Sequence, residues 1–161
     1  MSTLWSQDLF IKAWEYASLA HQGQTYSTPV AEIRLDYLTH IGAVAMELMH
    51  GLALDQQSLD FDYALQCALL HDVLEDTPRT YPELAAKFGS KIADGVAALS
   101  KNPDLPRTVQ MLDSLKRIQQ QPKEVWAVKL ADRINNLSAP PAHWTVERKL
   151  AYRAEAQVIY D

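Results

Sequence analysis

The sequence predicts an all-α fold, a single domain over residues 1–161 with about seven to eight helices. Three observations lead to this prediction. Apolar residues recur at intervals of three and four along most of the chain, as on the buried face of a helix. No segment shows the regular alternation that marks a strand. A length of 161 residues suits one domain, and we find no linker or internal repeat that would divide it.

The helical periodicity appears in eight segments along the chain. These segments are residues 9–21, 37–50, 60–76, 81–88, 90–100, 108–120, 125–137 and 145–160. Gly23 ends the first segment, and Gly51 occupies the position of a C-terminal glycine after the second. Residues 22–37 are expected to form an irregular loop, and Pro78 ends the third segment.

Capping residues and prolines set the helices of the second half. Thr80 and Glu83 form the pattern of a capping box, and Ser90 is expected to cap the following helix. Prolines lie in the loop that precedes the segment 108–120 and at the start of the segment 125–137. Two further prolines end that segment, and Thr145 is expected to cap the last helix, which runs to about Tyr160.

Composition narrows the range of partners and compartments. The formal net charge of −5 disfavours binding to a nucleic acid polymer or to an anionic membrane surface. No apolar stretch is long enough to span a bilayer, and the first ten residues do not resemble a signal peptide. The single cysteine excludes a disulfide framework and favours a reducing compartment, so we expect a cytoplasmic protein. A homo-oligomer is compatible with the sequence, which does not fix the oligomeric state.

One apolar segment ends in an unusual group of polar residues. His71, Asp72, Glu75 and Asp76 follow the apolar run that starts near Phe61, and no lysine or arginine lies among them. At ~100° per residue, all four side chains would share one arc of a continuous helix. Three neighbouring carboxylates are tolerated there only with raised pKa values, with cations from elsewhere in the chain, or with a bound metal.

Two further apolar helices each carry an isolated polar side chain, His40 in one and Asp132 in the other. If the three helices pack together, these residues could converge with His71 and Asp72. Two imidazoles and two carboxylates suit a divalent transition metal and balance its charge. Ligands spread over several helices leave coordination positions open, as in catalytic sites. Glu75 and the adjacent Asp76 would then remain uncommitted beside the metal, available for proton transfer.

Each of these residues also has an ordinary structural explanation. His40 could be a hydrogen-bonded core histidine, and Asp132 could pair with Arg133 or Lys129. Asn136 could be a residue of the last helical turn before the Pro-Pro sequence. The combination favours the metal site, because three apolar helices each carry a side chain of a metal-ligating type.

The same residues carry a family resemblance. They lie in three motifs: Tyr37-xx-His40, then Leu70-His71-Asp72-xx-Glu75-Asp76-Thr77, then Lys129-Leu130-Ala131-Asp132-Arg133-xx-Asn136-Leu137. Together they resemble the HD-domain phosphohydrolase superfamily. More narrowly, they are similar to the hydrolase domain of RelA/SpoT-type alarmone enzymes and to the small single-domain alarmone hydrolases. The Glu-Asp pair at this spacing is more specific than the His-Asp pair alone.

The resemblance implies a reaction and roles for the residues. It implies metal ligation by His40, His71, Asp72 and Asp132, with manganese as the expected ion. It implies that Glu75 and Asp76 are the acidic catalytic residues, and that Asn136 contacts a nucleotide substrate. The family reaction removes the 3′-pyrophosphate from guanosine tetra- or pentaphosphate (ppGpp or pppGpp). Lys129, which lies within the third motif, and Tyr26, which could stack on a base, are our further candidates for substrate contacts.

The sequence departs from the family pattern in the substrate-recognition segments. The basic pair that family members carry after Gly-Gln is missing, and Arg34 is the one basic residue nearby. Ile41 replaces a common proline, and the segment 137–139 lacks the usual arginine and threonine. Two alternatives therefore stay open. One is an HD-family nucleotidase or other nucleotide pyrophosphohydrolase, and the other is a non-catalytic HD module that binds a nucleotide.

Overall fold

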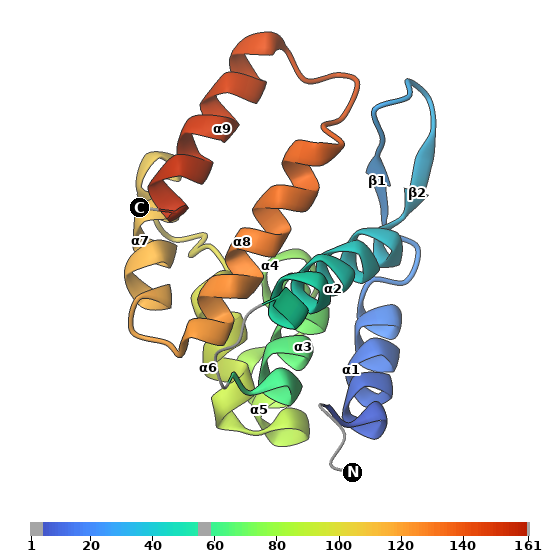
Figure 1. The fold of residues 1–161 in the computed structure, drawn as a ribbon, viewed down its shortest axis with the longest axis vertical. Helices are drawn as coiled ribbons and strands as arrows, with labels where there is room; N and C mark the ends of the chain where they lie inside the picture. Colours follow the sequence, from blue (N-terminus) through green and yellow to red (C-terminus); the bar gives the residue numbers. More distant parts are fainter. Residues whose placement is uncertain (1–4, 55–58, 161) are drawn as a thin grey trace.

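The computed structural model describes residues 5–54 and 59–160 and is helical apart from one small sheet (Figure 1). The helices are α1 (Gln7–Ala20), α2 (Tyr37–Leu54), α3 (Phe61–Leu70), α4 (Val73–Asp76), α5 (Tyr81–Phe88), α6 (Ser90–Leu99), α7 (Arg107–Ile118), α8 (Lys123–Ser138) and α9 (Val146–Tyr160). The sheet consists of β1 (Thr25–Ser27) and β2 (Arg34–Asp36). The predicted all-α class is confirmed, and each of the eight predicted segments forms helix.

The third predicted helix is not continuous, so the expectation of one helix over residues 60–76 is wrong. It ends at Leu70, and a new helical turn begins at Val73. At the break, the ring of His71 donates a hydrogen bond from Nδ1 to the carbonyl oxygen of Ala68, at 2.7 Å. Asp72, with φ −100° and ψ −2°, is the N-cap residue of the new turn. The interruption therefore lies at the His-Asp pair.

The expected irregular loop over residues 22–37 contains an antiparallel hairpin, in which Thr25 pairs with Asp36. Strands of three residues are too short for alternation to be visible in the sequence. The guanidinium of Arg34 is bound within the hairpin, where Nε donates to Thr25 Oγ1 at 2.7 Å and Nη1 to Ser27 Oγ at 3.1 Å. The basic residue closest to the missing Arg-Lys pair is thus held by its own hairpin.

Three helix ends test the capping predictions. The capping box of Thr80 and Glu83 is confirmed at the start of α5. The expectation that Gly51 ends the second helix is wrong, because α2 continues to Leu54. Ser90 is the first residue of α6, and Gly89, with φ +88°, is the cap in its place.

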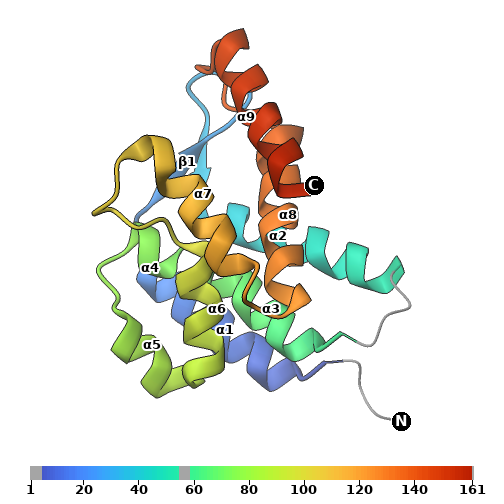
Figure 2. The same ribbon diagram turned by 90° about the vertical axis from the view of Figure 1, so that its left-hand side faces the viewer.

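The core forms around α3, in which eight of ten residues are buried. This helix packs against α1, α2, α6 and α8, and Figure 2 shows it between them. The close packing depends on Gly95 of α6, because a Cβ there would lie 2.7 Å from Tyr63 Oη and 3.0 Å from Cys67 Sγ. In contrast, α9 contains no buried residue and lies against α8.

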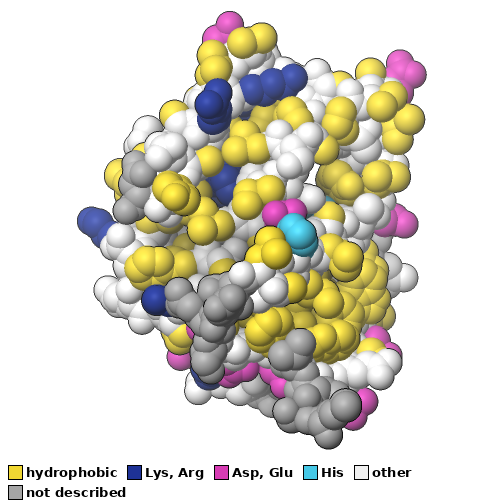
Figure 3. All heavy atoms as spheres, viewed as in Figure 1, with side chains coloured by type: hydrophobic (Ala, Val, Ile, Leu, Met, Phe, Trp, Pro, Cys, Tyr) yellow, Lys and Arg dark blue, Asp and Glu magenta, His cyan; other side chains and the backbone are white. Residues whose placement is uncertain are grey.

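The outer faces of α1 and α2 carry an exposed hydrophobic surface, seen in Figure 3. A shallow groove there is lined by Phe10, Ile11, Trp14, Gly42, Ala45, Met46 and Met49. Met46 is 65% exposed. Among the described helices, none is both long and apolar enough to cross a lipid bilayer.

Candidate metal centre

The fold brings the four predicted metal ligands together. His40 comes from α2, His71 and Asp72 from the break between α3 and α4, and Asp132 from α8. Nε2 of His71 lies 3.0 Å from Asp72 Oδ2, and Nε2 of His40 lies 3.7 Å from the same oxygen. Nε2 of His40 is also 3.6 Å from Asp132 Oδ1. Nε2 of His40 therefore lies within 4 Å of both carboxylates, and one of them also contacts His71.

Both histidines are oriented through their second ring nitrogen. Nδ1 of His71 donates to the carbonyl oxygen of Ala68, and Nδ1 of His40 lies 2.9 Å from Asn135 Oδ1, an acceptor. These hydrogen bonds hold a proton on Nδ1 of each ring and direct Nε2, the atom that would bind a metal, toward the centre. Metal-ligating histidines typically show this arrangement. Asn135, an unspecified position of the third motif, thus supports a candidate ligand.

The chemistry of these groups fits a divalent cation. Nε2 of His71 is buried and makes no hydrogen bond of good geometry among the described residues, although Asp72 Oδ2 lies 3.0 Å away. Ligating atoms of His40, His71 and Asp72 all lie within 4.8 Å of one another. Two carboxylates would neutralise the ion, and mixed nitrogen and oxygen ligands suit Mn, Fe or Zn. These residues could therefore hold the metal expected from the sequence.

Neighbouring charged groups shift the pKa values of the two candidate ligands between α3 and α4. Burial by itself lowers the pKa of His71, but the Asp72 carboxylate outweighs burial and raises the pKa of His71 to about 9. Burial would raise the pKa of Asp72, yet His71 and His40 hold it well below its ordinary value. A bound cation would take the place of the proton on His71.

Asp76 lies at the edge of the cluster and is joined to it by a tyrosine. The hydroxyl of Tyr37 lies 2.9 Å from Asp76 Oδ2 and 2.6 Å from Asp72 Oδ2. Desolvation and the charge of Asp72 raise the pKa of Asp76 above its ordinary value. Tyr37 is the first residue of the first motif, and the sequence predicts no role for it.

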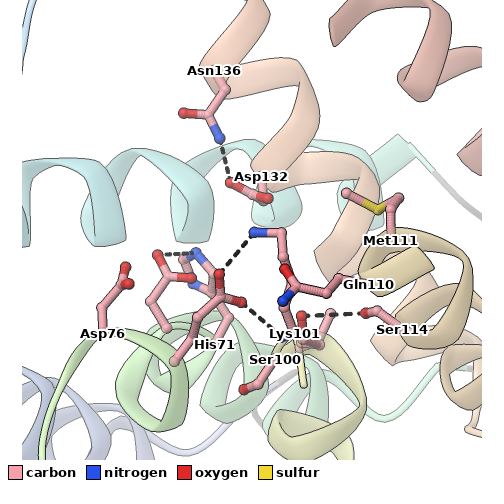
Figure 4. Close-up of polar contacts among 12 residues, drawn as sticks. His71, Asp76, Ser100, Lys101, Gln110, Met111, Ser114, Asp132 and Asn136 are labelled. Atoms are coloured by element: carbon pink, nitrogen blue, oxygen red, sulfur yellow. Dashed lines mark hydrogen bonds and ion pairs between the residues drawn. The ribbon is translucent and has the colours of Figure 1, made fainter. Parts of the chain in front are cut away.

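Glu75 is not uncommitted, contrary to the expectation from the sequence. Nζ of Lys101 lies 2.7 Å from its Oε1, and the backbone N–H of Lys101 donates to its Oε2 at 2.8 Å (Figure 4). Lys101 follows α6, 26 residues further along the chain. A cation from outside the motif therefore balances this acid. Of the three ways in which the carboxylates could be tolerated, a cation from elsewhere in the chain therefore applies to Glu75.

A pocket of about 310 Å³ opens over this cluster. All three predicted substrate contacts line it: Tyr26, Lys129 and Asn136. Nδ2 of Asn136 donates to Asp132 Oδ1 at 2.6 Å (Figure 4), and Lys129 Nζ lies 3.7 Å from Asp132 Oδ2. The two residues therefore contact a candidate metal ligand in this structure.

Another part of the pocket lining was not predicted from the sequence. Tyr152 and Glu155 of α9 line it, together with Arg133 of α8. The guanidinium carbon of Arg133 lies 3.7 Å from the centre of the Tyr152 ring, and Nη1 lies 3.3 Å from Glu155 Oε2. Arg133 is 3% exposed, so this contact attaches α9 to the helix that carries Asp132.

The model of the family described as HD domain matches residues 13–161. The chain belongs to the HD domain family. The segment spans all four candidate ligands and both catalytic candidates, so the predicted superfamily is confirmed.

Individual relatives narrow the comparison. The chain is 35% identical over 132 residues to the bifunctional (p)ppGpp synthase/hydrolase SpoT of Escherichia coli K12. This match covers 78% of the chain but 17% of SpoT, so the chain spans about a sixth of that relative. It is 27% identical over 151 residues to the zebrafish guanosine-3′,5′-bis(diphosphate) 3′-pyrophosphohydrolase MESH1, covering 91% of the chain and 79% of that protein.

A solved structure supports the fold. It is described as a metazoan ortholog of SpoT that hydrolyzes ppGpp, and it superposes with a TM-score of 0.78 at 23% identity. The match covers 96% of the chain and 84% of the solved chain. The chain therefore has the fold of that protein.

Proposed function

We propose that this HD-family protein is a metal-dependent phosphohydrolase that removes the 3′-pyrophosphate from guanosine 3′,5′-bis(diphosphate), giving GDP and pyrophosphate. The observation that carries the proposal is the convergence of His40, His71, Asp72 and Asp132, with both imidazoles oriented through Nδ1. The names of the SpoT and MESH1 relatives support the substrate. Manganese is our proposed ion. We also propose a cytoplasmic location, supported by the free, buried Cys67.

A divalent ion bound by these residues would lower the pKa of a coordinated water and polarise a phosphoryl oxygen. The reaction forms a bond between a water oxygen and phosphorus and breaks the bond from phosphorus to the 3′-oxygen. Water loses a proton, and the leaving oxygen gains one. The chain must therefore supply one acceptor and one donor of a proton.

The two acidic side chains lie in different environments, which supports separate roles for them. Glu75 is held by Lys101 through both carboxylate oxygens, whereas Asp76 has a raised pKa. A pair of acids in unlike environments is the usual basis for separate roles. We assign proton acceptance from water to Glu75 and proton donation to the 3′-oxygen to Asp76. Lys129, Asn136 and Tyr26 are our proposed contacts for the nucleotide.

The second candidate is a nucleotidase or another nucleotide pyrophosphohydrolase, which the charges of the pocket favour. Its three lysine and arginine side chains are already paired with carboxylates: Lys101 with Glu75, Lys129 with Asp132, and Arg133 with Glu155. Arg34 is bound in the hairpin and does not line this pocket. Such a pocket would suit a substrate with fewer phosphates than ppGpp.

The deciding experiment incubates the protein with Mn²⁺ and a panel of nucleotides, and measures pyrophosphate and orthophosphate separately. The panel contains ppGpp, pppGpp, GTP, and nucleoside 3′- and 5′-monophosphates. Release of pyrophosphate from ppGpp, abolished by a chelator and restored by Mn²⁺, is the expected result. Orthophosphate from monophosphates alone would replace the proposal with a nucleotidase. Binding of ppGpp with no product from any nucleotide would support the non-catalytic module.

A further inference from the structure

Tyr37 occupies a position that neither the motif nor the proposed reaction explains. Its hydroxyl lies 2.6 Å from Asp72 Oδ2 and 2.9 Å from Asp76 Oδ2, so it bridges a candidate metal ligand and a candidate acid. Tyr37 is the first residue of α2, whereas both carboxylates belong to the segment that follows α3. The bridge therefore joins two separate elements of the site.

Packing fixes the direction of the Tyr37 hydroxyl. The ring stacks on His21 with centroids 4.8 Å apart, and it meets the His40 ring edge-on at 5.5 Å. Its backbone N–H donates to the carbonyl oxygen of Gln24 at 3.0 Å. With backbone and ring both held, rotation of the hydroxyl hydrogen is the main remaining freedom of the donor.

The oxygen that this hydroxyl contacts is the one that faces the metal position. Asp72 Oδ2 is the atom 3.0 Å from His71 Nε2 and 3.7 Å from His40 Nε2. A carboxylate can rotate about its bond to Cβ and offer either oxygen. A hydrogen bond from Tyr37 to Oδ2 selects one rotation, and it keeps that oxygen between the two imidazoles.

We infer that Tyr37 is a positioning residue that orients the Asp72 carboxylate for a divalent cation and connects it to Asp76. The inference rests on the proposed metal-dependent function but concerns metal affinity, which is measured without substrate. Residues that hydrogen-bond to metal ligands contribute about 10- to 100-fold to metal affinity in other proteins. We expect the Tyr37 hydroxyl to contribute within this range.

The test measures Mn²⁺ affinity by titration calorimetry for the wild type, Tyr37→Phe and Tyr16→Phe. Tyr37→Phe keeps the ring that packs on His21 and His40, and it removes one oxygen atom. Tyr16→Phe is the matched control, because the Tyr16 hydroxyl is also buried and has no hydrogen-bond partner among the described residues. We expect the dissociation constant to rise at least tenfold in Tyr37→Phe and less than twofold in Tyr16→Phe. A change below threefold in Tyr37→Phe would overturn the inference.

A second variant keeps the inference testable if Tyr37→Phe does not fold. Asp76→Asn leaves Tyr37 and Asp72 in place and removes only the second carboxylate of the bridge. Mn²⁺ affinity is expected to stay within about fivefold of the wild type, since the bridge to Asp72 remains. A loss of tenfold or more in Asp76→Asn would show that Asp76 rather than Tyr37 supports the ligand, and would contradict the inference. If all variants bind Mn²⁺ as expected but no nucleotide is hydrolysed, the proposed function fails while the inference stands.

Discussion

Binding of Mn²⁺ should stabilise the fold, and removal of one candidate ligand should abolish the effect. The ion binds the folded chain because α2, the α3–α4 break and α8 bring His40, His71, Asp72 and Asp132 together. At an Mn²⁺ concentration 100 times the dissociation constant, this linkage amounts to about 2.7 kcal/mol. For a chain of this size, 1 kcal/mol shifts the melting temperature by about 2–4 °C, so we expect a rise of about 8 °C.

Scanning calorimetry with and without Mn²⁺ measures the shift in the wild type, in His71→Ala and in His143→Ala. His143 lines the same pocket but belongs to no contact of the cluster among the described residues, so it is the matched control. We expect the rise in the wild type and in His143→Ala, and less than 1 °C in His71→Ala. An equal rise in His71→Ala would place the bound ion elsewhere, and the absence of a rise in the wild type would refute the linkage argument.

Three further predictions follow from individual contacts. Glu75→Gln should lower kcat at least 100-fold, which is within the range for loss of a general base. The variant should keep the Mn²⁺-induced rise in melting temperature. Unchanged turnover would remove Glu75 from the reaction. Mn²⁺ binding at pH 7.5 should release about one proton, because His71, with a pKa raised to about 9, is protonated below that pH and must lose its proton to ligate. Affinity should therefore weaken as the pH falls below 9, and a binding enthalpy that is the same in buffers of different ionisation enthalpy would contradict this. Gly95→Ala should destabilise the fold by about 2 kcal/mol in urea unfolding, because the new Cβ would lie too close to Tyr63. Gly51→Ala should not destabilise the fold, because a Cβ there meets no atom within 4 Å.

The metal cluster was predictable because its residues conflict with their surroundings. His40 and Asp132 each stand on an otherwise apolar helix, and His71 with Asp72 ends another. Burial of such side chains requires partners, and their combination on three helices favoured one another and an ion over separate pairings such as Asp132 with Lys129. Helical periodicity and the expectation that the apolar faces pack together were enough to bring these residues into one cluster.

The supporting contacts were not predictable, since they depend on how the elements pack. Lys101 meets Glu75 across 26 residues, from a loop whose path the sequence does not indicate. The wall formed by Tyr152 requires the position of α9, and the apolar residues of this helix do not indicate that position because none of them is buried. The break at His71 escaped detection because the apolar periodicity continues through it, while a side-chain hydrogen bond to Ala68 marks the end of the helix.

The most direct test of the account is to locate the ion. Crystals grown with Mn²⁺ would give an anomalous difference map at the manganese absorption edge. We predict one strong peak within about 2.0–2.4 Å of His40 Nε2, His71 Nε2, Asp72 Oδ2 and an oxygen of Asp132, distances typical of nitrogen and oxygen ligands. A map without a peak at this position, or with its strongest peak at other side chains, would contradict the central claim.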